Sequence, residues 1–225
     1  MEEDKVNLYI SRVEEALKKA NAYDYKLNVR DLQLPGMSGI KTRIFFNGLV
    51  FKDTRYLEIG VWQGSTFISA LVNNDWELAV AIDNFSEFEG AEEIFIGNCQ
   101  HHVLDFSPEE AEGKKFYFLN IDCFKLTNDH KTVLRDMNLY FYDGGHSYND
   151  QFDAIAMFKD IVAEKFILIV DDWNWDPVKQ GTRDAIKKMG YKTHKEWELL
   201  NPNPEKQDDF LNWWNGLYVA VLEKQ

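Results

Sequence analysis

The feature that most constrains the fold is a regular alternation of short apolar runs and helix-like stretches that begins at Arg55. Strands are expected at residues 55–59, 78–82, 116–121, 139–142, 166–170, 192–200 and 217–223. Helices are expected between them at residues 65–73, 89–103, 127–136, 148–163 and 178–189. This alternation predicts an α/β fold with a doubly wound, mostly parallel, seven-stranded sheet and helices on both faces. The last two strands are joined by the polar loop 201–209 without an obvious helix, so the C-terminal strand is expected to run antiparallel.

The first part of the chain precedes this alternation. Residues 4–20 have apolar side chains at helical spacing, and residues 40–51 are expected to form a second helix. Between them, the break Leu34–Gly39 is either a lid over a site or an inert linker. We therefore divide the chain into an N-terminal helical extension or lid at residues 1–52 and a second domain at residues 53–225.

Composition narrows the range of partners. A chain of 225 residues that is 45% hydrophobic can bury one sizeable core. Its net charge of -13 argues against a nucleic-acid partner and against an anionic membrane surface. The N-terminus lacks a secretion-signal pattern, and no apolar run approaches the length of a membrane span. We therefore expect a soluble, cytoplasmic protein with neither a nucleic-acid nor a membrane partner.

The segment Arg55–Thr66 is predicted to be a strand, a glycine turn and the start of a helix. Gly60 and Gly64 allow a sharp turn and the close approach of a ligand. Ser65 is expected to cap the helix, and Glu58 is an acceptor suited to an ammonium group or a ribose hydroxyl. The turn differs from the dinucleotide fingerprint Gly-x-Gly-x-x-Gly, so by itself it fits an ordinary turn as well as a ligand site.

Carboxylates mark the ends of the first five strands in succession. They are Glu58, Asp83, Asp122, Asp143 and the pair Asp171–Asp172. The carboxyl ends of parallel strands line the ligand crevice of an open sheet, so these acids are expected to gather there. Asp83 follows Glu58 at about the spacing at which an acid meets ribose hydroxyls. Asp122 either accepts a hydrogen bond from an adenine amino group or caps the next helix.

The sharpest motif is Asp143-Gly-Gly-His146. His146 is either a general base near neutral pH or a histidine bonded to a backbone carbonyl. If the fourth and fifth strands are neighbours, Asp143, Asp171 and Asp172 can meet around a hard cation such as Mg²⁺. Because adjacent strand residues point to opposite faces, this requires the backbone to turn at Asp172.

Aromatic and histidine pairs are weaker signals. His101–His102 is rejected as a metal site because consecutive helix residues do not share a face. The run Trp173–Pro177 either walls a substrate pocket or packs in the core. Trp213 and Trp214 are assigned to packing.

Three motifs together resemble a known family. Tyr56–Thr66, Asp143–Tyr148 and Ile169–Trp173 are similar to motifs of class I S-adenosylmethionine (SAM)-dependent methyltransferases, and most closely to the metal-dependent macrocin O-methyltransferase type. The resemblance runs from about Pro35 to Ala185. It implies a Rossmann-like SAM-binding domain at residues 53–225 that methylates a hydroxyl of a saccharide or small natural-product acceptor with help from Mg²⁺.

The resemblance also implies roles for the residues at the strand ends. The cofactor would be bound by Glu58, Gly60, Gly64, Ser65, Asp83 and Asp122. The two glycines would pass under its methionine part, and Glu58 and Ser65 would lie near the amino and carboxylate groups. The metal ligands would be Asp143, Asp171 and Asp172. His146, together with Asp143, would be catalytic, and His146 would be the base.

Two other classes of function remain as alternatives. One is a catalytically inactive SAM-binding module that serves in an assembly. The other is an NAD-dependent oxidoreductase, against which the missing Gly-x-Gly-x-x-Gly speaks. The N-terminal helices offer a surface for a homo-oligomer.

Overall fold

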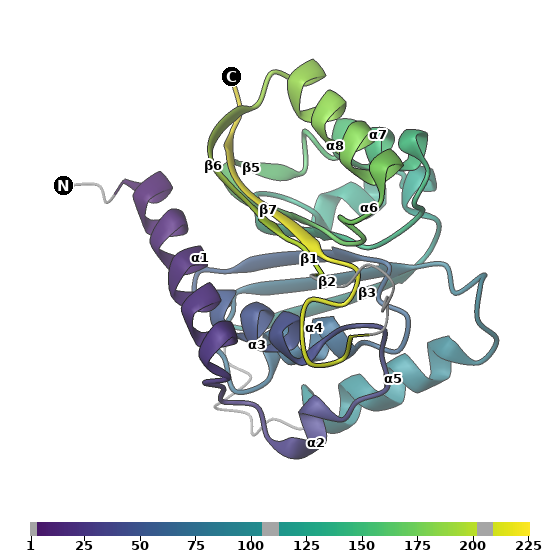
Figure 1. The fold of residues 1–225 in the computed structure, drawn as a ribbon. Coiled ribbons are helices and arrows are strands. Elements are labelled where there is room, and N and C mark those ends of the chain that lie inside the picture. Colours follow the sequence, from purple (N-terminus) through teal and green to yellow (C-terminus); the bar gives the residue numbers. More distant parts are fainter. Residues whose placement is uncertain (1–3, 105–112, 202–208) are drawn as a thin grey trace.

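The computed structural model describes residues 4–104, 113–201 and 209–225, and one sheet lies at its centre (Figure 1). Its strands are β1 (Arg55–Ile59), β2 (Leu78–Asp83), β3 (Lys115–Asn120), β4 (Met137–Tyr142), β5 (Val162–Val170), β6 (Lys192–Leu199) and β7 (Leu217–Glu223). They are ordered β3-β2-β1-β4-β5-β7-β6. The pairs among β1 to β5 are parallel, whereas β7 is antiparallel to both β5 and β6. The predicted doubly wound, mostly parallel sheet with an antiparallel C-terminal strand is therefore confirmed.

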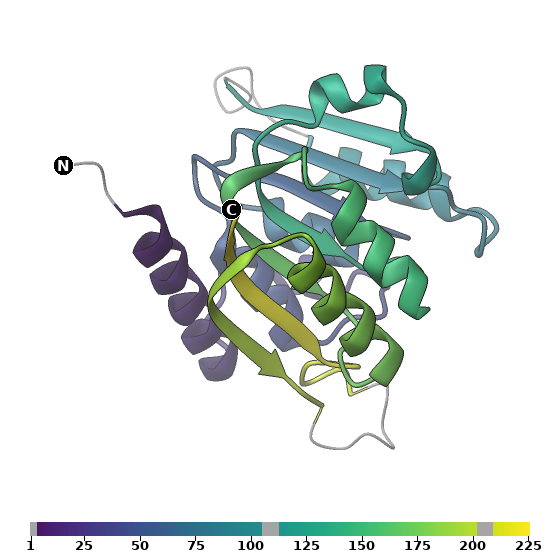
Figure 2. The same cartoon turned by 90° about the horizontal axis from the view of Figure 1, so that it is seen from above.

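Helices cover both faces of the sheet. The first face carries α1 (Lys5–Ala22), α2 (Val29–Leu32), α3 (Ile40–Leu49), α4 (Ser65–Leu71) and α5 (Ala91–His102). The second carries η1 (Cys123–Lys125), α6 (Asn128–Val133), α7 (Tyr148–Met157) and α8 (Asp176–Lys188). Figures 1 and 2 show α7 and α8 side by side on this second face. Successive strand residues alternate between the two cores, as Tyr56 and Leu57 do, because strand side chains point to opposite faces.

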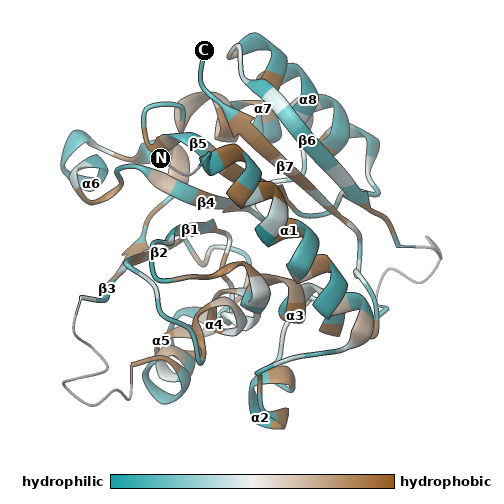
Figure 3. Cartoon of the chain, turned by 90° about the vertical axis from the view of Figure 1, so that its left-hand side faces the viewer, coloured by the Kyte–Doolittle hydropathy of each residue, from teal (hydrophilic) through white to brown (hydrophobic). Residues whose placement is uncertain are grey.

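The strands differ in hydropathy according to their place in the sheet. Strand β7, which lies between β5 and β6, is buried along most of its length and is hydrophobic, whereas the edge strand β6 is largely hydrophilic and partly exposed (Figure 3). None of the helices within the described ranges is long and apolar enough to cross a membrane.

Some elements differ from the sequence-based expectation. The single turns α2 and η1 were not expected, because one turn is too short to show a hydrophobic period. Strand β5 begins at Val162 rather than residue 166, since Val162 pairs with Met137 of β4 and Lys165 pairs with Glu223 of β7. Most of the predicted polar loop 201–209 falls in residues 202–208, outside the described part of the chain.

The N-terminal helices share the core of the sheet. Val13 of α1 and Phe46 of α3 are fully buried in the same cluster as sheet residues of β4, β5 and β7. The Phe46 ring lies 4.6 Å from that of Phe141 on β4, measured between centroids. The division of the chain at residue 52 stays a prediction.

Strand register brings the carboxyl ends to one edge. Ile59 of β1 is paired with both Ile82 and Tyr142, and Tyr142 is paired with Val170. The next residue or two of each strand therefore lie together at that edge. The strand order reverses between β1 and β4, which is where doubly wound sheets open a ligand crevice.

Replacing Phe46 by alanine tests the coupling between the N-terminal helices and the sheet. We expect Phe46→Ala to lower the free energy of unfolding by about 3–5 kcal/mol, the usual cost of a cavity left by a buried phenylalanine. Urea unfolding followed by tryptophan fluorescence measures it, with the exposed Tyr25→Ala as control. A separate early transition, with the main transition unmoved by Phe46→Ala, would instead identify residues 1–52 as an independent lid.

Candidate active site

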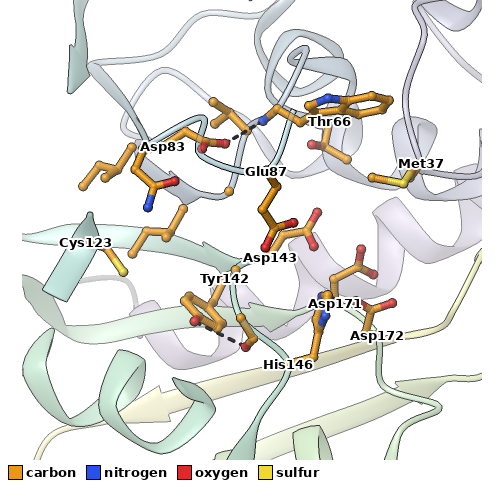
Figure 4. A pocket seen from close by; sticks show the side chains of 18 of the residues that line it. Met37, Thr66, Asp83, Glu87, Cys123, Tyr142, Asp143, His146, Asp171 and Asp172 are labelled. Atoms are coloured by element: carbon orange, nitrogen blue, oxygen red, sulfur yellow. Dashed lines mark hydrogen bonds and ion pairs between the residues drawn. The ribbon is translucent and has the colours of Figure 1, made fainter. Parts of the chain in front are cut away.

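A cavity of about 450 Å³ opens at the carboxyl ends of the strands, within the size range of small-molecule sites. Eight of the predicted site residues line it: Gly60, Ser65, Asp83, Asp122, Asp143, His146, Asp171 and Asp172. The other two, Glu58 and Gly64, do not line it. Figure 4 shows Asp83, Asp143, Asp171 and Asp172 around this cavity, and they come from the ends of three strands, β2, β4 and β5.

The glycine turn after β1 is shaped by packing against the protein itself. Gly60 has a φ of +85°, and a Cβ there would lie 1.8 Å from the backbone oxygen of Asp143. Gly64 has a φ of +89°, and a Cβ there would meet the Phe95 ring at 2.9 Å. Gly60 is therefore required for the ends of β1 and β4 to approach each other, and their closeness forms the floor of the cavity.

Ser65 does not cap α4, so that prediction is wrong. The helix begins at Ser65 itself, and its N-cap is Gly64, which has no side chain to offer. The Ser65 hydroxyl instead lies 3.0 Å from that of Ser38, in the segment before α3. Ser65 is thus the first residue of the helix, and the N-cap lies one residue earlier than the motif indicated.

Glu58 is fully buried next to the cavity wall. Its carboxylate accepts hydrogen bonds from Tyr56 and, at 2.5 Å, from Thr66. Burial raises the pKa of Glu58 to about 8, although the two hydroxyl donors oppose the rise. Thr66 lines the cavity and Glu58 does not, so direct contact between Glu58 and a cofactor stays a prediction.

Asp83 fastens the turn after β1 to the end of β2. One of its carboxylate oxygens accepts from the backbone N–H of Trp62 at 2.9 Å, and the other from that of Phe85 at 2.7 Å. Trp62 needs this support because its φ of 43° is left-handed, which is costly for a side chain of that size. The carboxylate is thereby held rigidly at the cavity wall.

Asp122 is the N-cap of η1. Its carboxylate accepts from the backbone N–H of Phe124 at 3.0 Å and pairs with Lys125 at 3.1 Å. These contacts, the backbone hydrogen bond first, lower the pKa of Asp122. The capping alternative is confirmed, and because Asp122 also lines the cavity, its contact with adenine stays a prediction.

The carboxyl groups of Asp143 and Asp171 both line the cavity and lie close enough to influence each other. Burial raises the pKa of both groups well above the usual range, and the nearby acids raise it further. Both carboxyls therefore take up a proton more readily than an exposed aspartate does.

Asp172 faces the same cavity because the backbone turns there. Its φ of 55° is left-handed, which meets the condition under which both acids of the pair can face one site. One oxygen of Asp172 lies 2.6 Å from His146 Nε2, and the other accepts from the Asn215 amide at 2.7 Å. The bond to Asp172 raises the pKa of His146, although burial opposes the rise. His146 is therefore paired with a carboxylate rather than with a backbone carbonyl.

The donor set at this end of the cavity fits a divalent cation. One ligand atom each from Asp143, His146 and Asp172 lies within 4.8 Å of the others, and two of the three are carboxylate oxygens, which hard cations prefer. Asp171 lines the same cavity but is not a member of this group. The group thus contains two of the three predicted aspartates, with His146 as its third member.

The cavity lining is strongly acidic. Besides the five aspartates, Glu87 lines it from the loop after β2, and Figure 4 shows this side chain near Asp143. Among the described lining residues there is no lysine or arginine. Such a lining suits a ligand or ion that carries positive charge.

Several lining residues were missed from the sequence. Met37 and Ser38 come from the break at Leu34–Gly39, so this segment forms part of the cavity wall. Asn215, which precedes β7, also lines the cavity and was not singled out in the sequence.

The aromatic assignments were correct only in part. Trp175 lines the cavity, with its ring 4.8 Å from that of His146, whereas Trp173 packs on Tyr218 in the core. Trp213 packs in the core as expected, but Trp214 lines the cavity, so its assignment to packing was wrong.

Solved structures of several methyltransferases have a fold similar to that of this chain. M. jannaschii TYW2 in complex with AdoMet has a TM-score of 0.56 and 11% identity, over 89% of this chain and 82% of that one. Streptococcus pneumoniae Sp1610, a proposed tRNA (m1A22) methyltransferase bound to SAM, has a TM-score of 0.51 and 13% identity, over 82% and 72%. SMU.776, a proposed methyltransferase complexed with SAH, has a TM-score of 0.54 and 13% identity, over 82% and 48%.

These likenesses concern the fold. This chain spans about half the length of SMU.776 and of a proposed Streptococcus mutans methyltransferase. No protein-family model and no curated protein sequence matches the chain. The chain has the Rossmann-like fold of class I SAM-dependent methyltransferases.

Replacing Glu58 by glutamine should change how stability depends on pH. Between its unfolded pKa near 4.5 and about 8, Glu58 takes up a proton on folding, so wild-type stability falls as pH rises through that window. The amide does not titrate, so wild type should lose about 1.4 kcal/mol per pH unit relative to Glu58→Gln. Urea unfolding at pH 5, 6, 7 and 8 measures this, with the exposed Glu93→Gln as control. A difference independent of pH would show that Glu58 is ionised in the folded protein.

Proposed function

We propose that this protein is a SAM-dependent O-methyltransferase that acts, with the help of a divalent cation, on a hydroxyl of a small acceptor such as a saccharide. The observation that carries the proposal is the acidic cavity at the switch point of a methyltransferase fold. SAM carries a sulfonium and an ammonium group, and both are favoured by carboxylates. The resemblance of the strand-end motifs to macrocin-type enzymes supports the hydroxyl acceptor.

The cofactor would lie across the ends of β2, β1 and β4. Asp83 ends β2 and has both oxygens fixed by backbone donors, which suits an acceptor of two ribose hydroxyls. Asp122 at the next strand end would face the adenine. The turn from Gly60 to Ser65 would hold the amino-acid part.

The metal would be held by Asp143, Asp171 and Asp172. Ligand atoms of Asp143 and Asp172 lie within 4.8 Å of each other and of one from His146. A bound divalent cation would lower the pKa of the acceptor hydroxyl and fix its position. In methyl transfer, the acceptor oxygen forms a bond to the methyl carbon as the bond from that carbon to sulfur breaks. The chain then mainly has to align the two atoms and remove one proton.

His146 is the proposed base. Its Nε2 is held by Asp172, so Nδ1 is the atom left to accept the hydroxyl proton. Asp172 would stabilise the imidazolium that forms, and Asn215 keeps that carboxylate in place. Trp175 packs edge-on against the imidazole and limits its rotation. The side chain of His146 is 45% exposed, so the proton can pass to water afterwards.

The acidic lining also bears on the class of acceptor. Sp1610 is described as a proposed tRNA methyltransferase, which raises RNA as an acceptor for this fold. Binding to an RNA backbone relies on lysine and arginine side chains that neutralise phosphates. This chain has a net charge of -13, and its described cavity lining has six acids without a lysine or arginine. A small, uncharged acceptor fits this surface better than RNA.

Acceptor assays test the proposal. SAM with a radioactive methyl group is incubated with saccharides, glycosides and polyols, and with total tRNA, in Mg²⁺ or after treatment with EDTA. We expect label in a small hydroxyl acceptor and at least about a 100-fold loss of rate in EDTA. The Asp143→Asn variant should lose methyl-transfer rate to the same extent, while it still binds S-adenosylhomocysteine.

Each of the other possible assay results would overturn a different part of the proposed function. Label in tRNA would overturn the acceptor class, and full activity after metal removal would overturn the role of the cation. Tight SAM binding without label in any acceptor would instead favour a binding module that lacks catalysis.

Asp83→Asn tests the position of the ribose. The substitution removes the charge and leaves one oxygen to serve two hydroxyls and two backbone donors, so affinity for S-adenosylhomocysteine should fall about tenfold or more. Isothermal titration calorimetry measures it, and Asp75→Asn, exposed before the start of β2, is the control. Unchanged affinity in a folded Asp83→Asn variant would place the ribose elsewhere.

A further inference from the structure

Arg43 of α3 is a fully buried arginine whose hydrogen bonds all go to one short segment. Its Nη1 donates to the backbone oxygens of Leu32 and Leu34 at 2.8 and 2.7 Å. Its Nε donates to the Ser38 hydroxyl at 3.1 Å, and Nη2 lies 3.5 Å from the Gly36 oxygen. The guanidinium therefore fixes the strap at residues 32–38, which supplies Met37 and Ser38 to the cavity wall.

The charge of Arg43 is not neutralised by a carboxylate within the described part of the chain. Its partners are carbonyl and hydroxyl oxygens, and the ring of Phe210 lies 5.5 Å from its Cζ. Burial lowers the pKa of Arg43 to about 10, which leaves it charged near neutral pH. Burying a positive charge without a negative partner costs folding free energy, and a bound anion nearby would offset that cost.

A chain of hydroxyls leads from Arg43 to the cavity. The Ser38 oxygen accepts from Arg43, which favours its own proton being donated onward to the Ser65 oxygen 3.0 Å away. Ser65 then has its own proton left to donate, and both serines line the cavity. Gly36 keeps this contact close, since a Cβ there would lie 2.0 Å from the Ser65 hydroxyl oxygen.

The rest of the cavity repels anions. Figure 4 shows Met37 and Thr66 on one side of Asp143, with Asp171, Asp172 and His146 on the other side. The remaining lining bears carboxylates, so a negatively charged group of a ligand is favoured only at the serine end. The amino-acid part of SAM ends in such a group, a carboxylate.

We propose that Arg43 is a positioning residue for the cofactor: acting through Ser38 and Ser65, it presents a hydroxyl donor to the carboxylate of the cofactor's amino-acid part. The inference rests on the proposed function, because it takes SAM as the ligand. On this inference, the strap at residues 32–38 makes the site select nucleosides that carry the amino-acid part. Met37, held by the same strap, closes the cavity beside that group.

Two nucleosides separate this role from a structural one. S-adenosylhomocysteine carries the amino acid, and 5′-methylthioadenosine has the same adenosine and thioether without it. Ser38→Ala should lower affinity for S-adenosylhomocysteine about tenfold and leave that for 5′-methylthioadenosine within about twofold. Arg43→Lys keeps a charge but loses the fork that holds Ser38, so it should show the same selective loss.

Calorimetric titration of both nucleosides into the full chain measures these affinities. Lys41→Met is the matched control, since it removes a positive charge from the same helix without touching the strap. Equal losses for the two nucleosides, or no loss in Ser38→Ala, would overturn the role of Arg43 while leaving the proposed function standing. If wild type binds neither nucleoside, the proposed function fails and the inference fails with it.

Discussion

The close approach of Gly60 to the backbone of Asp143 is the contact on which the site depends. It joins the ends of β1 and β4, the two strands between which the sheet reverses its order. Any side chain at residue 60 would push these ends apart, since even a Cβ would lie 1.8 Å from the Asp143 oxygen. With the ends together, the residues that follow β2, β4 and β5 face a single cavity.

Gathering carboxylates in a partly buried cavity is unfavourable by itself, and the titration behaviour of the site reflects that cost. Burial and the neighbouring acids raise the pKa values of Asp143 and Asp171, and Asp172 is paired with His146. Positive ligands offset the same cost. A sulfonium cofactor and a divalent cation would both do so, which links the electrostatics of the site to the chemistry proposed for it.

Much of this arrangement could be predicted from the sequence, because local patterns determine it. Strands β1 and β7 were predicted with their observed bounds, and the convergence of the strand-end acids followed from parallel topology. What could not be predicted depends on contacts between distant segments. No periodicity relates Arg43 to Ser65, or Asn215 to Asp172. The left-handed turn at Asp172 could be stated only as a condition, since residues of that kind adopt it occasionally.

The most direct measurement is anomalous diffraction from a crystal grown with S-adenosylhomocysteine and Mn²⁺. The central claim is that one acidic crevice holds both a nucleoside cofactor and a cation. It predicts a single strong manganese peak between Asp143 and Asp172, with the nucleoside in the same cavity and its ribose at Asp83. A nucleoside bound away from the ends of β1 and β2, or manganese absent from the aspartates, would contradict it.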